Sequence, residues 1–333
     1  MAFWKNRSVF ITGAGGLLGG WMTTALCERG ANVVALVRDS VPRNMFFRDG
    51  LDRRVTVVRG GLSDSELLRR IIAEYEVSTI FHLAAQALVT VAKSDPVGTL
   101  EANVQGTWNL LEAVRQTGRD TQVVFASSDK AYGNSMELPY RETHPLVGEY
   151  PYDVSKSCAE LIAKMYVRTY GLSLAVTRCG NLFGGGDLNF SRTIPGAILS
   201  TLRNEPFQIR SDGNYVRDFL YVEDAVEGYL CLAENLARNS SLSGEAFNFS
   251  LGLRLTVLDI VAKVLEIMGR TDLKPEILNI ASAEIREQYM VADKARERLD
   301  WNPVYHLEEG LRRTINWYEE YYRTLEERGP NKN

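Results

Sequence analysis

The sequence has few cysteines and no long uninterrupted hydrophobic run. Only 4 of 333 residues are cysteine, and no two form a Cys-x-x-Cys pair, so we expect reduced thiols rather than disulfides or a metal site. The most apolar stretch, residues 80–92, contains His82, Gln86 and Thr90 and is too short to cross a bilayer. A strand expected from residue 8 leaves no room for a signal peptide. These features predict a cytoplasmic protein without metal.

An excess of charge of one sign is also lacking. The 42 acidic and 38 basic residues leave a net charge of −4, and the isoelectric point is about 5.6. This balance of charges indicates no basic patch that would bind nucleic acid or a membrane surface. Hydrophobic residues (45%) and charged residues (24%) are at ordinary globular levels, which excludes disorder, collagen and long coiled coil.

Apolar strands alternate with amphipathic helices in the first half of the chain. Strands are expected at residues 8–11, 32–37, 55–59, 79–83, 122–126 and 173–178, and helices at 17–29, 66–75, 101–116 and 155–170. Continuous apolar strands separated by helices predict an α/β fold, a doubly wound parallel (Rossmann) sheet covered on both faces.

From residue 184 the alternation stops, and helices are expected at 193–202, 257–268 and 307–327. This loss of regular strand–helix alternation predicts a smaller α+β substrate-binding lobe at residues 184–216 and 251–328. The dinucleotide-binding domain is then 1–183 plus about 217–250, because a helical pattern at 222–236 is expected to pack back on the sheet. Residues 329–333 are expected to be frayed.

A glycine-rich turn lies between the first strand and the first helix. Residues 12–19 read Thr-Gly-Ala-Gly-Gly-Leu-Leu-Gly, which places Gly13, Gly16 and Gly19 at G-x-x-G-x-x-G spacing. Such glycines allow a tight turn, a close backbone approach to a pyrophosphate and close helix–strand packing, and the helix N-terminus favours phosphate. A merely tight turn is the alternative, but the strand–turn–helix context favours dinucleotide binding.

A serine, a tyrosine and a lysine are expected at the carboxyl edge of the sheet. Tyr152 and Lys156 are at i and i+4 of one helix, and Ser127-Ser-Asp-Lys130 ends the strand at 122–126, where ligands of this fold bind. Alone, such a Tyr–Lys pair is common on surfaces. Beside a nicotinamide, the ring charge and Lys156 would favour the phenolate of Tyr152. Lowering its pKa from about 10 to about 7 corresponds to roughly 4 kcal/mol.

These stretches together resemble the extended short-chain dehydrogenase/reductase family, in particular its nucleotide-sugar epimerases and dehydratases. The matching stretches are residues 12–19, 81–85, 103–107, 127–133, 151–156, 178–181 and 217–224. The resemblance implies catalytic roles for Ser128, Tyr152 and Lys156. The cofactor-binding residues that it implies are Gly13, Gly16, Leu17, Leu18, Gly19, Arg38, Asp39, Leu62, Leu83, Ala84, Ala85, Asn103, Tyr152, Lys156 and Cys179. The implied substrate-binding residues are Gln86, Ser128, Asn181, Arg192 and Arg217.

Within that family, the triplet Ser128-Asp129-Lys130 is similar to that of CDP-glucose 4,6-dehydratases. The resemblance implies conversion of a nucleotide-diphosphate hexose to its 4-keto-6-deoxy form. Tyr152 would take the C4 hydroxyl proton and Asp129 would protonate the departing C6 hydroxyl. Lys130 would remove the C5 proton or hold the enolate charge. The alternatives are a 4-epimerase, in which Asp129 and Lys130 are idle, and a non-catalytic dinucleotide-binding protein.

The end of the second strand bears on the choice of cofactor. An acidic residue that binds the ribose of NAD is usual there, but this chain has Val37 followed by Arg38 and Asp39. Arg38 suits the 2′-phosphate of NADP, whereas Asp39 suits a ribose. We expect NAD, as in the family's nearest relatives, with NADP as the alternative.

A homodimer is expected as well. The helices at 101–115 and 155–170 carry more apolar residues than one sheet face needs to cover, namely Leu110, Leu111, Ala159, Ile162, Ala163 and Tyr166. Family members pair these two helices into a four-helix contact. The other expected partner is the nucleotide-diphosphate hexose substrate, with no nucleic acid and no membrane.

Overall fold

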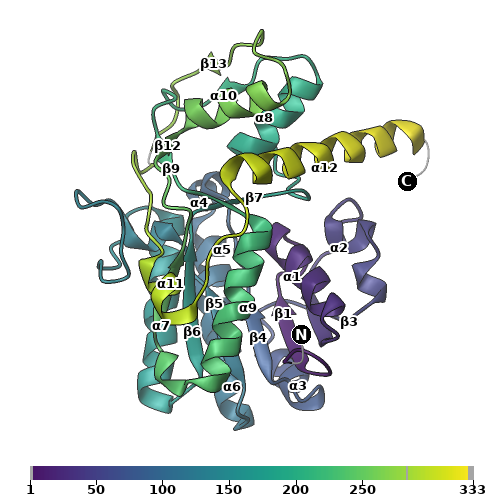
Figure 1. Cartoon of the computed structure of the whole chain (residues 1–333). Coiled ribbons are helices and arrows are strands. Elements are labelled where there is room, and N and C mark those ends of the chain that lie inside the picture. The colour runs from purple at the N-terminus through teal and green to yellow at the C-terminus, as the bar shows by residue number, and fades with distance from the viewer. Residues whose placement is uncertain (1–2, 283, 329–333) are drawn as a thin grey trace.

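Seven parallel strands form one sheet in the computed structural model, which describes residues 3–282 and 284–328 (Figure 1). The order β11-β6-β5-β4-β1-β2-β3 reverses direction between β1 and β4, as in a doubly wound fold. The strands are β1 (Ser8–Thr12), β2 (Asn32–Val37), β3 (Thr56–Arg59), β4 (Thr79–His82), β5 (Gln122–Ala126), β6 (Leu174–Cys179) and β11 (Ala246–Phe249). The predicted fold class is confirmed, and the expected fraying of 329–333 lies outside the described residues.

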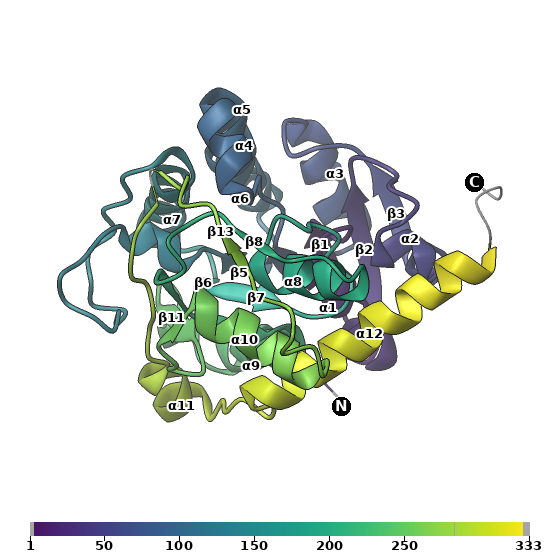
Figure 2. The same ribbon diagram turned by 90° about the horizontal axis from the view of Figure 1, so that it is seen from above.

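Helices cover both faces of this sheet (Figure 2). One face carries α1 (Leu17–Glu28) and α9 (Val222–Arg238), which share a buried apolar cluster with the strands. The other face carries α3 (Ser65–Glu74), α6 (Gly106–Thr117) and α7 (Pro151–Tyr170), which form a second cluster. Because helices cover both faces of the central strands, these strands are continuous apolar runs instead of alternating ones, and the edge strand β3 is partly exposed.

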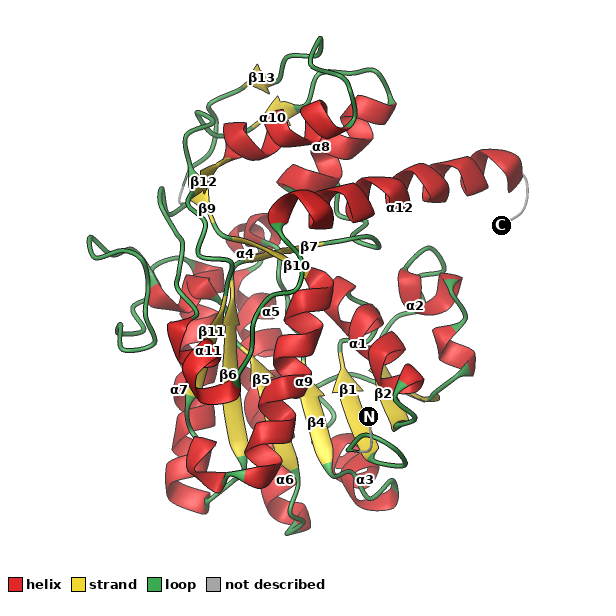
Figure 3. Cartoon of the chain, in the orientation of Figure 1, coloured by secondary structure: helices red, strands yellow, loops and turns green. Residues whose placement is uncertain are grey.

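A smaller group of elements lies over the carboxyl ends of the strands, toward which the strand arrows point (Figure 3). It contains α8 (Thr193–Leu202), α10 (Val257–Ile267), α12 (Leu307–Arg328) and the strand pairs β8 (Gln208–Ile209) with β13 (Glu276–Ile277) and β9 (Val216–Arg217) with β12 (Leu255–Thr256). These helices bury their own apolar cluster. A capping box of Thr256 and Asp259 starts α10. No helix within the described ranges is long and apolar enough to span a membrane.

Shorter elements complete the chain and connect the two parts. They are α2 (Met45–Arg48), α4 (Val89–Ser94), α5 (Pro96–Leu100), α11 (Asp293–Leu299), the paired strands β7 (Asn181–Phe183) and β10 (Phe219–Tyr221), and 3-10 turns at Leu51–Arg53, Asp129–Tyr132 and Ser240–Leu242.

Two differences from the expected helices affect the site. The helix expected from residue 155 begins earlier, at Pro151, because proline is favoured in the first helical turn, where its missing N–H costs nothing. Tyr152 therefore lies in the first turn of α7. The helix expected at 101–116 is divided into a π-helical turn at Glu101–Gln105 and the regular helix α6.

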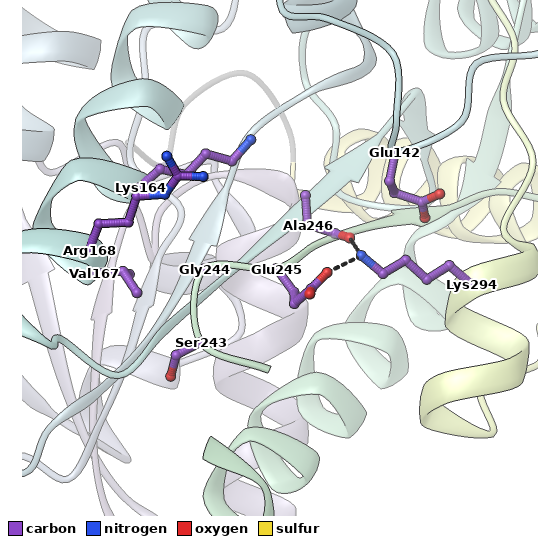
Figure 4. A pocket seen from close by; sticks show the side chains of 9 residues that line it. All are labelled: Glu142, Lys164, Val167, Arg168, Ser243, Gly244, Glu245, Ala246 and Lys294. Carbon is purple, nitrogen blue, oxygen red and sulfur yellow. Dashed lines mark hydrogen bonds and ion pairs between the residues drawn. The ribbon is translucent and has the colours of Figure 1, made fainter. Parts of the chain in front are cut away.

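Charged side chains cover the outer edge of β11, which ends the sheet (Figure 4). The amide of Asn248 donates to Glu142 Oε1 over 2.8 Å, and Lys294 Nζ donates to the carbonyl of Ala246 over 2.8 Å and also to Glu245. These groups line a cavity of about 380 Å³. Because charged side chains bond to the backbone amide and carbonyl on its open edge, β11 is protected from pairing with a strand of another molecule.

The apolar residues expected at a dimer contact are buried within the chain. Leu110, Leu111, Ala159, Ala163 and Tyr166 pack in the cluster beneath α6 and α7, and Ile162 lies against it. The expectation that they exceed what one sheet face covers is therefore wrong, because the helices enclose them together. The large apolar side chains that these two helices do expose are Trp108, Leu161, Met165 and Tyr170.

A buried ion pair joins β6 to α7. Arg178 Nε donates to Glu160 Oε2 over 3.0 Å, Nη2 donates to Oε1, and Nη1 donates to Tyr132 Oη over 2.7 Å. Arg178 is 1% exposed and Glu160 is fully buried. Burial would raise the pKa of Glu160, but the hydrogen bonds and charge of Arg178 hold it below its ordinary value. The pair therefore fixes α7 and the 3-10 turn at Asp129–Tyr132 on the same strand.

We expect Arg178→Met to lower the free energy of unfolding by about 3–5 kcal/mol, because the buried Glu160 carboxylate loses its two hydrogen bonds from Arg178 and keeps only the ion pair with Lys164. Denaturant unfolding measures this loss. Arg168→Met, on the exposed end of α7, is the control and should change it by less than about 0.5 kcal/mol. A loss as small as that of the control would contradict the structural role of the pair.

Candidate active site

The glycine turn after β1 is closely packed against the end of β4. Gly13 has φ +82°, and a Cβ atom there would lie 2.7 Å from the amide nitrogen of Ala84. A Cβ atom on Gly19 would lie 2.0 Å from the carbonyl oxygen of Gly13. Gly16 starts α1 without a side-chain cap, so no side chain occupies the amides of the first turn. These features fit a dinucleotide, whose phosphates would meet the backbone at this turn.

Other predicted cofactor residues surround this turn. Leu17 and Leu18 begin α1, and Leu83, Ala84 and Ala85 follow β4. Leu62 packs against Gly106 at the start of α6, and Cys179 is buried at the end of β6. The residues that follow β1 and β4 lie at the switch point of the sheet, and Leu62 and Cys179 follow or end the strands β3 and β6 at the same carboxyl edge.

An arginine and an aspartate lie side by side at the end of β2. Arg38 Nε donates to Asp39 Oδ2 over 2.6 Å, and both side chains are exposed. The nearby Arg59 donates to Ser40. The carboxylate that suits a ribose and the guanidinium that suits a 2′-phosphate are thus both present.

The five predicted catalytic residues lie on two adjoining elements. Ser128 precedes the 3-10 turn that carries Asp129 and Lys130, and this turn packs against α7, which carries Tyr152 and Lys156. Ser128 Oγ donates to Asp129 Oδ1 over 2.9 Å, and Lys156 Nζ donates to the carbonyl of Ala126 over 2.9 Å. Four of the five are buried and Lys130 is partly buried.

Among the protein's own groups, burial dominates the pKa of Tyr152. Burial raises it to about 12, the carboxyl of Asp129 adds to the rise, and Ser128 and Arg192 oppose it. Burial also lowers the pKa of Lys156 to about 8. The expected lowering of the Tyr152 pKa depends on the nicotinamide ring charge as well as on Lys156 and stays a prediction, because the protein's own groups are dominated by desolvation of the phenolate.

Three ionisable groups gather next to Tyr152. Burial raises the pKa of Asp129, against the charges of Lys130 and Arg217 and the hydrogen bond from Ser128. Burial and Arg217 lower the pKa of Lys130, against the pull of Asp129 and Asp153. Burial raises the pKa of Asp153 to about 6, and its Oδ2 has no hydrogen-bond partner among the described residues. Asp129 is therefore suited to hold a proton, which agrees with the role expected of a general acid.

Asn103, in the π-helical turn, joins the segment after β4 to α7 by side-chain hydrogen bonds. Its Oδ1 accepts from the Gln86 amide over 2.7 Å, and its Nδ2 donates to the Gln86 carbonyl over 3.0 Å and to Ser155 Oγ over 2.8 Å. The side chain of Gln86 is itself engaged with the backbone of Leu88. Both residues were expected to contact ligands, and their side chains make these contacts within the protein.

The predicted substrate-binding residues Arg192, Arg217 and Asn181 make their contacts within the protein. Arg217 Nη2 lies 3.2 Å from Glu284 Oε2, and Arg192 Nη1 lies 3.0 Å from Asp187 Oδ2. Asn181 Nδ2 donates to the Asp218 carbonyl over 3.3 Å. Each arginine thus has a carboxylate partner, so its guanidinium is held in place where an anion could replace that partner.

A cavity of about 120 Å³ opens at Tyr152. Its lining includes residues that the sequence analysis missed, which are Lys93, Tyr150, Arg210 and Glu284. Lys93 Nζ donates to Ser282 Oγ over 3.0 Å, which joins α4 to the smaller lobe. No motif could have indicated these residues, because they lie far apart in the chain and meet only at this opening.

The parallel sheet, the glycine turn and the grouped serine, tyrosine and lysine define a short-chain dehydrogenase/reductase that acts on nucleotide sugars. The family model described as GDP-mannose 4,6 dehydratase matches residues 10–314, and the chain belongs to this family. It is 34% identical to the CDP-glucose 4,6-dehydratase of Salmonella typhimurium, over 96% of this chain and 93% of that protein.

Solved structures share the fold. The dTDP-glucose 4,6-dehydratase of Streptomyces venezuelae, solved with NAD bound, is 27% identical, with a TM-score of 0.86 over 96% of this chain and 98% of that one. The UDP-glucose 4-epimerase of Thermotoga maritima, solved with UDP-glucose, is 27% identical, with a TM-score of 0.85 over 95% of this chain and 100% of that one. Dehydratases and epimerases therefore share this architecture, and the reaction must be argued from the site.

Proposed function

We propose that this chain is a nucleotide-sugar 4,6-dehydratase that uses bound NAD to convert a nucleotide-diphosphate hexose into its 4-keto-6-deoxy form. The observation that carries the proposal is the position of Asp129 and Lys130, which lie in the same site as Tyr152. Loss of the C6 hydroxyl needs a proton donor and a group that handles the C5 proton or the enolate charge. The similarity to CDP-glucose and dTDP-glucose 4,6-dehydratases supports it.

The first step removes the C4 hydroxyl proton. Tyr152 Oη takes this proton, and Ser128 steadies the same oxygen by a hydrogen bond. NAD, when bound, supplies the hydride acceptor for C4 and a ring charge that favours the Tyr152 phenolate. Lys156, at one helical turn from Tyr152, holds the cofactor ribose, and Gly13, Gly16 and the start of α1 hold the phosphates.

The second step expels water across C5 and C6. The 4-ketone acidifies the C5 proton, which Lys130 removes or whose enolate Lys130 stabilises. Asp129 gives its proton to the C6 hydroxyl, which leaves as water. Burial raises the pKa of Asp129, which supports its role as the donor. The reduced cofactor, when bound at the glycine turn, would supply the hydride to C6, and return of a proton to C5 would complete the 4-keto-6-deoxy sugar.

The substrate is proposed to lie between the sheet and the smaller lobe. Arg192, Arg217 and Asn181 would hold its diphosphate, with the guanidinium groups exchanging their carboxylate partners for phosphate oxygens. This supports the division into a dinucleotide-binding domain, at 1–183 with about 217–250, and a substrate lobe, at 184–216 and 251–328. The four cysteines are free thiols, which supports a cytoplasmic location.

We expect Tyr152→Phe to fold normally and retain cofactor but to lose at least about a hundredfold in turnover, because the general base is removed and the packing is kept. Steady-state assay of water loss from nucleotide-glucoses measures this. Tyr170→Phe, at the exposed end of the same helix, is the control and should be as active as wild type. More than about a tenth of wild-type activity in Tyr152→Phe would rule out this role.

Asp129→Asn tests dehydratase against epimerase. In a dehydratase, C4 oxidation needs no proton from Asp129, so the variant should accumulate reduced cofactor and 4-keto-hexose while water loss falls by about 10²–10⁴-fold. Nicotinamide absorbance in a single turnover and the mass of the sugar measure the two steps. Asn is nearly isosteric with Asp, so folding should be preserved.

Exposed Asp120→Asn is the matched control, and it should leave both steps unchanged. An epimerase would show only a modest effect of Asp129→Asn on turnover. Wild-type protein that interconverts C4 epimers and never releases water from any nucleotide-hexose would favour the 4-epimerase.

We also propose a homodimer formed through α6 and α7. The exposed apolar side chains of Trp108 (42%), Leu161 (55%) and Met165 (41%) on these neighbouring helices support it, because such residues favour burial against a partner. Light scattering at micromolar concentration should give twice the chain mass, and Leu161→Glu with Met165→Glu should give the monomer. A monomeric mass for wild type would refute the proposal.

A further inference from the structure

Gln288 is a fully buried amide that no proposed step uses. Its backbone is held from two sides: its amide donates to the Val216 carbonyl over 3.1 Å, and the Tyr140 amide donates to the carbonyl of Tyr289 over 2.9 Å. The Met290 amide donates to Asp218 Oδ2 over 3.1 Å. The segment that carries Gln288 is therefore anchored both to β9 and to the loop at Tyr140.

The side chain of Gln288 is directed at the active site. Its Oε1 accepts a hydrogen bond from Lys130 Nζ. Its Nε2 is buried and has no hydrogen-bond partner among the described residues. Only the oxygen of a carboxamide can accept from an ammonium, so the reverse orientation would direct two donors at each other. The contact with Lys130 therefore fixes the orientation of the amide, although its nitrogen remains unsatisfied.

Lys130 has charged neighbours on several elements. Asp129 precedes it on the same turn, Asp153 comes from α7, and Glu284 and Arg217 come from the smaller lobe; the three carboxylates favour the ammonium, whereas Arg217 and burial oppose it. Gln288 provides the hydrogen-bond acceptor for Nζ, and its carbonyl dipole favours the positive charge. The balance between these groups decides where Nζ lies and whether it carries its proton.

We propose that Gln288 is a positioning residue that holds Lys130 Nζ beside Asp129 and favours its protonated form for the water-loss step. The role in water loss rests on the proposed function, whereas the effect of Gln288 on the position and pKa of Lys130 does not. Of the two roles considered for Lys130, stabilisation of the enolate needs the ammonium that this contact favours, whereas removal of the C5 proton would need the neutral amine. A residue from the smaller lobe would thus position a lysine of the turn that follows β5.

Two near-isosteric variants of opposite effect test this. Gln288→Met removes the acceptor and should lower the pKa of Lys130, whereas Gln288→Glu places a carboxylate there and should raise it by about one unit or more. Competitive labelling with acetic anhydride over a pH series, read by mass spectrometry with exposed Lys5 as the reference, measures this pKa without turnover. Asn279→Asp adds the same charge to an exposed position and is the control for Gln288→Glu.

In single turnover, Gln288→Met should slow water loss at least about tenfold while C4 oxidation stays near the wild-type rate. The half-maximal pH of water loss should move in opposite directions in the two variants. Equal Lys130 pKa values in all three proteins, or an unchanged water-loss rate with altered pKa, would overturn the proposal. If wild type releases no water from any nucleotide-hexose, the proposed function fails, and the labelling still decides whether Gln288 sets the Lys130 pKa.

Discussion

The buried pair of Arg178 and Glu160 is the interaction on which the active site depends. It joins β6 to α7, and the third hydrogen bond of Arg178, to Tyr132, adds the turn that carries Asp129 and Lys130. Tyr152 lies two helical turns before Glu160 on α7. Because a buried ion pair tolerates little displacement once its partners are desolvated, it fixes the acid–base groups relative to Tyr152.

Burial determines the chemistry of the groups that this pair positions. It raises the pKa values of Tyr152, Asp129 and Asp153 and lowers that of Lys130. Every one of these groups is thereby moved toward its neutral form, which suits Asp129 as a proton donor, whereas Tyr152 needs the charge of the bound cofactor to act as a phenolate base. The same desolvation makes the site costly to fold, and its carboxylates and cations compensate one another both within the turn of Asp129 and Lys130 and across elements.

The parts of this structure that sequence predicts are those set by local spacing. The strands follow from the periodicity of apolar residues. The glycine turn follows from the spacing of its glycines between a strand and a helix. The grouping of Ser128 with Tyr152 follows because parallel strands end at one edge of the sheet, where ligands of this fold bind. The π-helical turn that places Asn103 has no such signal. Glu284 and Gln288 were missed because their partners, Arg217 and Lys130, are distant in the chain. The desolvation that raises the Tyr152 pKa could not be predicted, because it depends on packing between distant segments.

The smaller lobe contacts charged groups of the proposed active site as well as lying over the carboxyl ends of the strands. Its segment after β13 brings Glu284 to Arg217 and Gln288 to Lys130, so one stretch of chain contacts both the guanidinium proposed for the diphosphate and the lysine proposed for the water loss. A diphosphate that displaces Glu284 from Arg217 also removes a carboxylate that favours the Lys130 ammonium. Substrate binding and the proton affinity of Lys130 are then linked through shared charges, without any change of fold.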